Sequence, residues 1–335
     1  MNKSSAKVLP VGTVLFTSRA GIGKTAILLK EGCTNQGFQS IVPNKDKLDS
    51  YFIFTRSEEL KRYGETVGAG STFVEVSGKQ MANMELMMPT TMDEQQQIGE
   101  YFQSLDHLIT LHQQKCDETK EFKKYMLQNM FPQKDEKVPK IRFAGFTGDW
   151  EQRKFSDIAA RESSISASAT NIPSVEYEDV VAEEGRLNKD IHLKEAVKSG
   201  ITFDGSQVLY GKLRPYLHNW LNPDFKGIAV GDWWVLKPIN MDKKFLYRLI
   251  QTQQFDNIAN QSSGSKMPRA DWNLISNSEF MIPFSKEEQS KIGRYFDSLD
   301  HLITRHQQKC NALKEFKKYM LQNMFPQKGE NKCQN

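Results

Sequence analysis

The chain has 335 residues, which predicts two or three domains, and its 45 Lys and Arg against 41 Asp and Glu leave a net charge of +4. This mildly basic balance permits a polyanionic partner without requiring one, and no apolar stretch approaches the length of about 18 residues that predicts a membrane span. Four cysteines without a CxxC pair, behind a start that leads into no signal-like apolar run, argue against a disulfide framework or a zinc site and predict a reducing cytoplasm.

Residues 1–92 are interpreted as a first globular domain, and they contain one stretch that resembles a phosphate-binding loop. The stretch 21–25 reads Gly-Ile-Gly-Lys-Thr, whereas a Walker-type loop needs the pattern GxxxxGK[ST]. Ser18 stands where the first glycine is required, and Ala26–Leu29 is typical of a strand rather than of a long amphipathic helix. A stand-alone nucleotide-binding enzyme is therefore kept only as an alternative.

Residues 93–131 lack proline and are predicted to form one long helix. Thr91 or Asp93 is expected to cap its first turn, and Pro132 to end it. At this length the helix would be a rod of about 58 Å. Apolar or weakly polar residues recur at spacings of three and four, as in a coiled-coil seam, at Phe102, Leu105, Ile109, His112, Cys116, Thr119, Met126 and Met130.

Residues 135–286 are interpreted as a second globular domain, which opens at Ile141–Phe146 (IRFAGF) with Trp150 nearby. Its middle part, residues 210–220, mixes lysine, arginine, aromatic rings and an asparagine. A later loop, residues 262–269, combines small residues with basic ones. Basic residues interleaved with aromatic and amide side chains are typical of nucleic-acid contacts, although a solvated surface has the same composition.

Residues 288–328 repeat residues 94–134 at an offset of 194, with 33 of 41 positions identical. A second long helix is accordingly predicted over residues 287–325. The same offset also relates sparse matches further upstream, which predicts two domains of one fold, each followed by a near-identical helix. These matches include Val14-Leu15 with Val208-Leu209, Gly37 with Gly231, and Tyr51-Phe52 with Phe245-Leu246.

Two such seams in one chain are expected to pair with each other as an antiparallel coiled coil with pseudo-twofold symmetry. His112 and Cys116, with His306 and Cys310, would form a polar layer in the middle of the seam and set its register. A metal site is not expected, because the histidines within each helix are five residues apart and do not share a helix face.

The first copy of the repeat is expected to be incomplete at its N-terminus. Subtracting the offset from Ile141 gives position −53, so the first domain would lack about its first fifty residues. A truncated or silent recombination cassette, which donates its second domain through the repeats, therefore remains an alternative.

The second domain contains only partial versions of the motifs of two enzyme classes. Asn222–Phe225 reads Asn-Pro-Asp-Phe, which departs from the Asn-Pro-Pro-Phe motif of amino-methyltransferases and fits a simple turn. Asp224 and Lys226 have no second acidic residue at a spacing suited to a metal-dependent nuclease. We therefore assign no catalytic residue to the chain.

The ordered set of motifs resembles the specificity subunits of type I restriction–modification enzymes over essentially the whole chain. That family's recognition domain opens with RFxGF…W, here Arg142–Phe146 and Trp150. It closes with a Gly-Ser turn, an aliphatic–Pro strand and a helix that begins Glu-Gln-x-x-Ile. These elements occur as Gly264-Ser265, Ile282-Pro283 and Glu288-Gln289 with Ile292, and as Gly70-Ser71, Met88-Pro89 and Glu94-Gln95 with Ile98.

The resemblance implies an α+β fold in which two target-recognition domains alternate with two long helices. The expected boundaries are 1–92 and 135–286 for the recognition domains, 93–134 and 287–327 for the helical spacers, and 328–335 for a tail. Each recognition domain would read one half of a split target in double-stranded DNA. The helices would hold the half-sites one to two helical turns of DNA apart, at about 34 Å per turn.

The resemblance also implies partners and places the chemistry outside this chain. Two modification subunits would dock on the helices, hold S-adenosylmethionine and methylate adenine, while a restriction subunit would use ATP and Mg²⁺ for translocation and cleavage. The chain itself would be a cytoplasmic, non-catalytic subunit without a cofactor of its own and without membrane contact.

Arginine can bind guanine and asparagine adenine through paired hydrogen bonds, while lysine and serine more often hold phosphates. On this basis the candidate DNA contacts of the second domain are Lys212, Arg214, Asn219, Ser265, Lys266 and Arg269. Residues 17–25 take the corresponding place in the first domain, which makes Arg19 and Lys24 the candidates there. The candidate docking residues, from a segment that both helices keep unchanged outside the seam, are Phe122, Tyr125, Phe316 and Tyr319.

Overall fold

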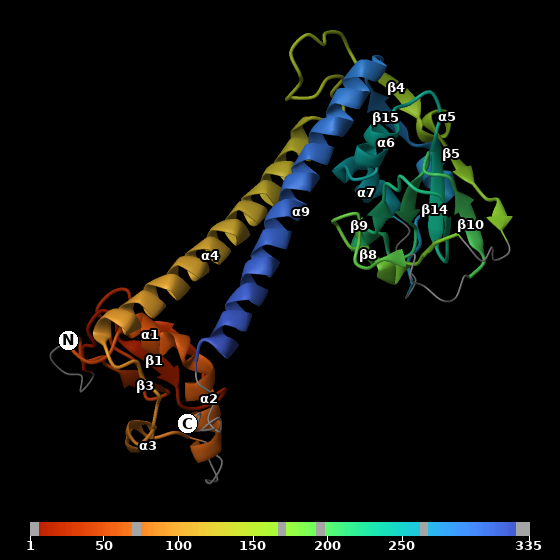
Figure 1. Ribbon diagram of the computed structural model, residues 1–335. Coiled ribbons are helices and arrows are strands. Elements are labelled where there is room, and N and C mark those ends of the chain that lie inside the picture. The colour runs from red at the N-terminus through yellow and green to blue at the C-terminus, as the bar shows by residue number, and fades with distance from the viewer. Residues whose placement is uncertain (1–6, 69–74, 167–171, 192–197, 262–266, 326–335) are drawn as a thin grey trace. The chain divides into compact units, whose positions relative to one another are not determined.

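The computed structural model of the chain describes residues 7–68, 75–166, 172–191, 198–261 and 267–325. The chain divides into two compact units, one of residues 1–114 with 306–335 and one of residues 115–305 (Figure 1). Each unit thus combines one globular domain with a segment of each long helix. Within the described ranges, no helix is both long and apolar enough to cross a membrane.

The first domain is a small antiparallel sheet covered by short helices. Its central strand β1 (Val14–Thr17) pairs with β2 (Thr25–Ile27) on one side and with β3 (Phe38–Ile41) on the other. Alternate residues of β1, Val14 and Phe16, are fully buried against Ile53 and Leu60. The helices are α1 (Ser50–Thr55), α2 (Ser57–Gly68) and α3 (Gly78–Ala82).

The second domain contains a larger antiparallel sheet with the order β12-β11-β14-β5. Its strands are β12 (Trp220–Leu221), β11 (Val208–Gly211), β14 (Trp233–Pro238) and β5 (Ala159–Glu162). Residues on both faces of β11 and β14 are buried, because one face packs on the helices and the other on a second sheet. Trp233 and Trp234 both lie in these cores, with exposed fractions of 1% and 2%.

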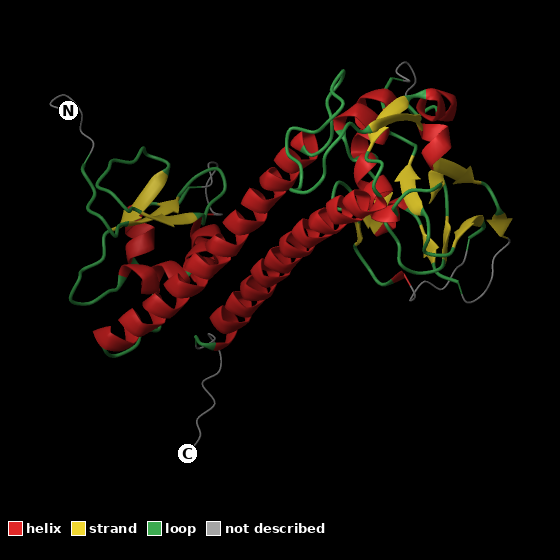
Figure 2. Ribbon diagram, turned by 90° about the horizontal axis from the view of Figure 1, so that it is seen from above, coloured by secondary structure: helices red, strands yellow, loops and turns green. Residues whose placement is uncertain are grey.

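The remaining strands and helices complete this domain (Figure 2). The second sheet has the order β6-β10-β13-β7, formed by β6 (Ile165–Ser166), β10 (Gly200–Phe203), β13 (Gly227–Ala229) and β7 (Ser174–Val175). Two further pairs are β4 (Glu151–Lys154) with β15 (Glu279–Ile282), and β8 (Val180–Val181) with β9 (Arg186–Leu187). The helices are α5 (Phe155–Ile158), α6 (Lys243–Leu249), α7 (Gln253–Ala259), α8 (Trp272–Asn277) and the 3-10 turns η1 (Tyr177–Asp179) and η3 (Pro215–Leu217).

The two domains share one core topology, but the ungapped offset of 194 expected from the sequence is wrong in detail. In both domains the central strand pairs in the same register, Val14 with Ile41 and Val208 with Leu236, so β3 and β14 differ by 195. The N-caps of α1 and α6, Asp49 and Asp242, differ by 193. Loops absorb these single-residue changes because the buried pattern of a strand does not tolerate a one-residue slip.

Two of the expected pairings therefore change. Phe52 corresponds to Phe245 rather than to Leu246, and Gly37 corresponds to Asp232 rather than to Gly231. The second correspondence follows from the backbone bonds, since Ser18 N donates to Gly37 O as Lys212 N donates to Asp232 O. The described part of the first domain contains no counterpart of the strands β4 to β9.

The two long helices are α4 (Met92–Asn129) and α9 (Lys286–Asn323), and each begins one residue before and ends two residues before the predicted boundary. Thr91 caps α4, because its hydroxyl accepts a hydrogen bond from Glu94 N at 3.3 Å. The early end of α4 follows from Pro132, which disfavours helical backbone at the residue before it.

The helices pack antiparallel, and equivalent residues of the repeat make the same contact twice. In one unit Lys317 binds Asp106 at 2.6 Å, and in the other Lys123 binds Asp300 at 2.6 Å. The thiols of Cys116 and Cys310 are fully buried, and they point to the carbonyls of Ile303 and Ile109 respectively, each at 3.8 Å. The seam predicted from the spacing is therefore confirmed within each unit.

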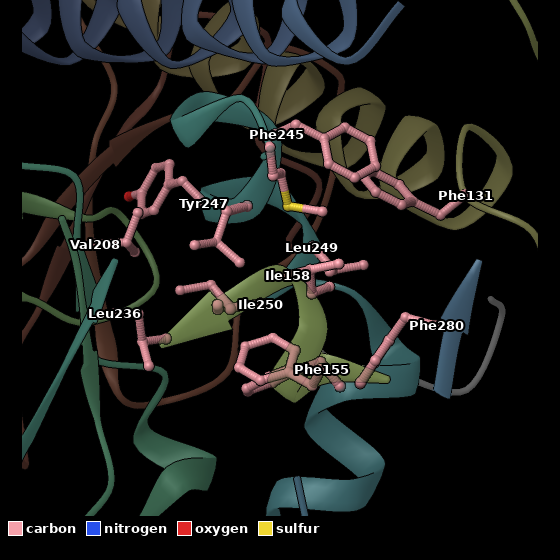
Figure 3. Packing of buried hydrophobic residues seen from close by; sticks show 14 of the residues in the cluster. Phe131, Phe155, Ile158, Val208, Leu236, Phe245, Tyr247, Leu249, Ile250 and Phe280 are labelled. Carbon is pink, nitrogen blue, oxygen red and sulfur yellow. The ribbon is translucent and has the colours of Figure 1, made fainter. Parts of the chain in front are cut away.

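An aromatic residue just beyond the end of each long helix anchors it on the globular part of its own unit. Phe131 follows α4 and packs on Phe245 of α6, with ring centroids 5.3 Å apart (Figure 3). Phe325 follows α9 and packs edge-on against Phe52 of α1, with ring centroids 6.0 Å apart and an interplanar angle of 75°. Each of the two rings is less than a tenth exposed.

Polar contacts hold the N-terminal turns of the two long helices against their domains. Arg142, from the opening motif of the second domain, binds both oxygens of Glu288 at 2.7 and 2.9 Å, and Glu288 is only 1% exposed. Gln289 accepts a hydrogen bond from Asp242 N, the N-cap of α6, as Gln95 does from Asp49 N. The Arg-Phe and Glu-Gln motifs thus fasten the domain to its helix rather than forming a reactive site.

Candidate nucleic-acid interface

The loop of residues 212–219 connects β11 to β12 and carries the strongest candidates of the second domain. Arg214 is exposed, and the side chain of Lys212 is 31% exposed. The backbone of Arg214 is left-handed, with φ of 49°, which turns the chain into η3. Gly211 precedes the loop, and a Cβ there would lie 2.9 Å from the hydroxyl of Tyr177, so only glycine allows this close approach.

Residues 267–270 lie directly beside this loop, although some fifty positions separate them in the sequence. Arg214 N donates to Pro268 O at 2.7 Å, and Ala270 N donates to Lys212 O at 2.8 Å. Leu213 and Arg269 form an isolated antiparallel bridge. The structure therefore brings together Lys212, Arg214 and Arg269, which were predicted as contacts on two separate segments.

Asp232 joins the two segments electrostatically, and the sequence did not single it out. Arg269 donates to both of its carboxylate oxygens at 3.3 and 3.1 Å, and Lys212 Nζ lies 3.5 Å from it. The hydrogen bond from Arg269, with the charges of Arg269 and Lys212, lowers the pKa of Asp232. Two cations around one carboxylate leave a net positive charge at this cluster.

Tyr177 supports the loop from inside the domain. Its hydroxyl donates to Asp232 O at 2.7 Å and accepts from Leu213 N at 2.9 Å, and its ring lies 4.7 Å from that of Trp233. Burial of the hydroxyl raises the pKa of Tyr177, so it stays a neutral donor. No sequence signal marked this residue, because its role depends on contacts that are distant along the chain.

The other candidates of the second domain have different positions. Asn219 is 8% exposed, and its backbone carbonyl accepts from Gly211 N at 2.7 Å, so its side chain is not offered at the surface. Ser265 and Lys266 lie outside the described residues.

The corresponding loop of the first domain, residues 18–24, joins β1 to β2. Ser18 N donates to Gly37 O and Val76 N donates to Ser18 O, as Lys212 N and Ala270 N do with Asp232 O and Lys212 O in the second domain. The positional match predicted for residues 17–25 is thus confirmed. Lys24 is exposed, and Arg19 binds Glu75 at 2.8 Å.

This loop leads into strand β2 rather than into a helix, as expected from Ala26–Leu29. A Walker-type loop needs a helix N-terminus directly after it, so the geometry is unlike a phosphate-binding loop. The Asn222–Phe225 segment is a bend after β12, and Phe225 packs on Phe203 with ring centroids 5.5 Å apart. That packing is unlike an open catalytic motif.

The four candidate docking residues are all exposed on the long helices. Phe122 and Tyr125 of α4 are 47% and 53% exposed, and their repeat equivalents Phe316 and Tyr319 of α9 are 45% and 61% exposed. Exposed apolar side chains that occur together, rather than singly, are typical of an interaction surface. The same patch therefore occurs once in each unit.

The histidines of the seam meet their own repeat equivalents. Nδ1 of His112 lies 3.0 Å from Nδ1 of His306, so one ring donates and the other accepts. In the described ranges, no cluster of three or more His, Cys, Asp or Glu side chains is placed to hold a metal ion. The predicted polar layer is thus present as a histidine pair.

A family model for the type I restriction modification DNA specificity domain matches residues 1–121 and 148–315. The type I restriction enzyme MjaIX specificity subunit of Methanocaldococcus jannaschii is 27% identical over 182 residues, which is 50% of this chain and 40% of that protein. The putative MjaX specificity subunit of the same organism is 26% identical over 121 residues, which is 36% of this chain and 28% of that protein. The chain thus matches less than half the length of these curated relatives.

Solved structures resemble the fold over a larger share of the chain. The crystal structure of a type I restriction–modification S subunit from M. genitalium matches with a TM-score of 0.66 and 13% identity, and covers 95% of this chain and 84% of that one. A structure described as showing complex assembly of the type I R-M system matches with a TM-score of 0.50 and 15% identity, over 95% and 83% of the two chains.

Proposed function

Because the chain belongs to the type I restriction–modification DNA specificity family, we propose that it is the subunit that reads the DNA target through the 212–219 loop and residues 267–269. The observation that best supports this proposal is the backbone pairing of these two segments, which brings Lys212, Arg214 and Arg269 together. We place this activity in the cytoplasm, together with the DNA.

The arrangement of charges supports base reading rather than phosphate binding alone. Asp232 holds the guanidinium of Arg269 by two hydrogen bonds, so little side-chain freedom remains to be lost when that guanidinium binds a base edge. Arg214 has an exposed side chain on a backbone fixed by the bond to Pro268. A guanidinium held in this way suits the paired hydrogen bonds that select guanine in the major groove.

The test begins by finding the target. Adenine methylation is mapped across the genome of a host that expresses this chain with its modification subunits, and the methylated motif is then used as a duplex in binding titrations. Arg214→Ala and Arg269→Ala are each expected to raise the Kd for that duplex about 5- to 150-fold, which corresponds to about 1–3 kcal/mol. Arg153→Ala is the matched control, since Arg153 is also an exposed arginine beside a carboxylate, Glu151. Unchanged affinity in both loop variants would refute this site.

We further propose that the aromatic patch on each long helix docks one modification subunit. Its two occurrences, on α4 and α9, support a complex with two such subunits. The S-adenosylmethionine, ATP and Mg²⁺ of the system would then be bound by partner subunits, with ATP and Mg²⁺ on the restriction subunit. The proposed target is bipartite, with the 18–24 loop of the first domain, including Arg19 and Lys24, reading the second half.

Light scattering of the assembled complex tests the docking proposal. The double variant Phe122→Ala/Tyr125→Ala is expected to lose one modification subunit, and Phe316→Ala/Tyr319→Ala the other. The control is Tyr101→Ala, because Tyr101 is another exposed aromatic residue of α4. No complex with the unaltered, folded chain would instead favour a silent gene copy.

A further inference from the structure

His218 ends the 212–219 loop and is held between carboxylates from two other elements of the second unit. Its Nε2 lies 2.9 Å from Asp256, and its Nδ1 lies 3.3 Å from Glu183. Asp256 belongs to α7 and Glu183 to the turn between β8 and β9, three elements that Figure 1 labels. The ring stacks on Trp220 at a centroid distance of 5.3 Å and an interplanar angle of 22°. The side chain is only 28% exposed, so the packing fixes its orientation.

The chemistry of the two contacts selects one protonation state. A carboxylate only accepts hydrogen bonds, and a neutral imidazole has one donor nitrogen. Both contacts are therefore hydrogen bonds only when His218 carries a proton on each nitrogen. The backbone at His218 is left-handed, with φ of 53°, a conformation that needs support from its surroundings for a non-glycine residue.

The same turn connects the loop to α4. Glu183 N donates to His218 O at 3.0 Å, and the adjacent Glu184 binds Lys120 of α4 at 3.2 Å. Arg186 holds the other oxygen of Glu184 at 2.6 Å. These contacts form a continuous connection between the loop and the helix. His218, Glu183, Glu184 and Lys120 also line one cavity of about 510 Å³.

We propose that His218 is a positioning residue for the 212–219 loop. With a proton on each ring nitrogen, it braces this loop and connects it through the 182–185 turn to α4. Reading of the target weakens when one of these two protons is lost. The proposal rests on the proposed function, because it assigns a pH-dependent control to that same loop.

The direction of the pH dependence follows from the contacts. The hydrogen bond to Asp256, aided by the charges of Asp256 and Glu183, raises the pKa of His218 above its ordinary value of about 6.5, although partial burial opposes this. The brace is therefore complete below that ordinary pKa and is lost as the pH rises through the raised pKa. The other charged groups lining the cavity are Lys120, Glu121, Lys123, Lys124, Glu184 and Asp300.

Hydrogen exchange of the full chain without DNA gives the first test. After correction for intrinsic exchange, the amides of residues 213, 214 and 216–218 should lose protection as the pH rises from 6.5 to 8.5 in the unaltered chain. His218→Gln should show the low protection at every pH, while the control His301→Gln, an exposed histidine on α9, should behave as the unaltered chain. Equal profiles for all three proteins would overturn the proposal.

DNA binding gives the second test and separates the two ideas. The Kd for the methylated motif should rise over the same pH range in the unaltered chain and in His301→Gln, and stay constant in His218→Gln. If no protein binds the motif while the exchange profiles differ as expected, the brace exists and the proposed function fails. If His218→Gln keeps the full pH dependence of binding, the brace is wrong and the proposed function survives.

The link to α4 is tested separately by Lys120→Met. This change removes the contact to Glu184 and should lower the protection of the loop about twofold to threefold at pH 6.5, while the pH dependence remains. Lys124→Met is the matched control, because Lys124 lines the same cavity on the same helix. Equal loop protection in the two variants would contradict a connection through Lys120.

Discussion

Removing Asp300 should destabilise the second unit more than removing its repeat equivalent Asp106 destabilises the first. Asp300 accepts hydrogen bonds from Arg248 and Lys123, each at 2.6 Å, and these side chains are 1% and 11% exposed. Burial alone would lower the pKa of Arg248, but Asp300 and Asp297 raise it, so the guanidinium stays charged. Asp300→Ala thus leaves buried positive charge with one carboxylate fewer.

The magnitude follows from this burial. Loss of one partner from a buried, hydrogen-bonded charge network costs about 3–5 kcal/mol. Asp106 contacts Lys317, which is 22% exposed, and the neutral hydroxyl of Tyr51 at 2.6 Å. A hydrogen bond to a charged group contributes about 1.5–3 kcal/mol to stability. Asp106→Ala is therefore expected to lower the free energy of unfolding by this smaller amount.

Urea denaturation followed by tryptophan fluorescence measures the larger effect. All five tryptophans lie between residues 150 and 272, so the signal reports on the second unit. With a slope of about 2 kcal/mol per molar urea, the midpoint for Asp300→Ala should fall by about 1.5–2.5 M. The urea midpoint of Asp300→Asn, which retains a hydrogen-bond acceptor, should lie between those of the unaltered chain and of Asp300→Ala. A decrease of less than about 0.5 M in the urea midpoint of Asp300→Ala would refute the reasoning.

Three further outcomes are expected. Gly293→Ala should destabilise the second unit by about 1–3 kcal/mol in the same assay, because its Cβ would lie 3.1 Å from the backbone nitrogen of Phe245. Phe325→Ala should destabilise the first unit by about 3–5 kcal/mol, which would be detected as faster hydrogen exchange in α1. Unchanged exchange in α1 would contradict the anchoring role of Phe325. Since the hydrogen bond from Arg269 lowers the pKa of Asp232, its stabilising effect is present above pH about 4 and is lost as the pH falls further, which carboxylate NMR titration would detect.

The helices could be predicted from the sequence because their determinants are local. The spacing of apolar residues predicted the seam, and Pro132 predicted the end of α4 to within a few residues. The pairing of His112 with His306 followed from the repeat, since equivalent residues of two antiparallel copies meet near the centre of the seam.

The site could be predicted only in part because its determinants are distant in the sequence. Lys212 and Arg269 were recognised by type, but their convergence depends on the pairing of β11 with β14, which brings Asp232 between them. Asn219 resembled a base-reading residue, yet its position next to β12 buries it. Tyr177 and His218 act through contacts that no local pattern encodes.

The duplicated contacts of the seam have a consequence for inheritance. Since Asp106 with Lys317 and Asp300 with Lys123 are one interaction formed twice, either half of the chain presents an isologous surface that is complementary to itself. A recombination event within the repeated helical segment would exchange one globular domain for another and restore the same seam contacts. Under the proposed function, new target combinations would then arise without any compensating change in the helices.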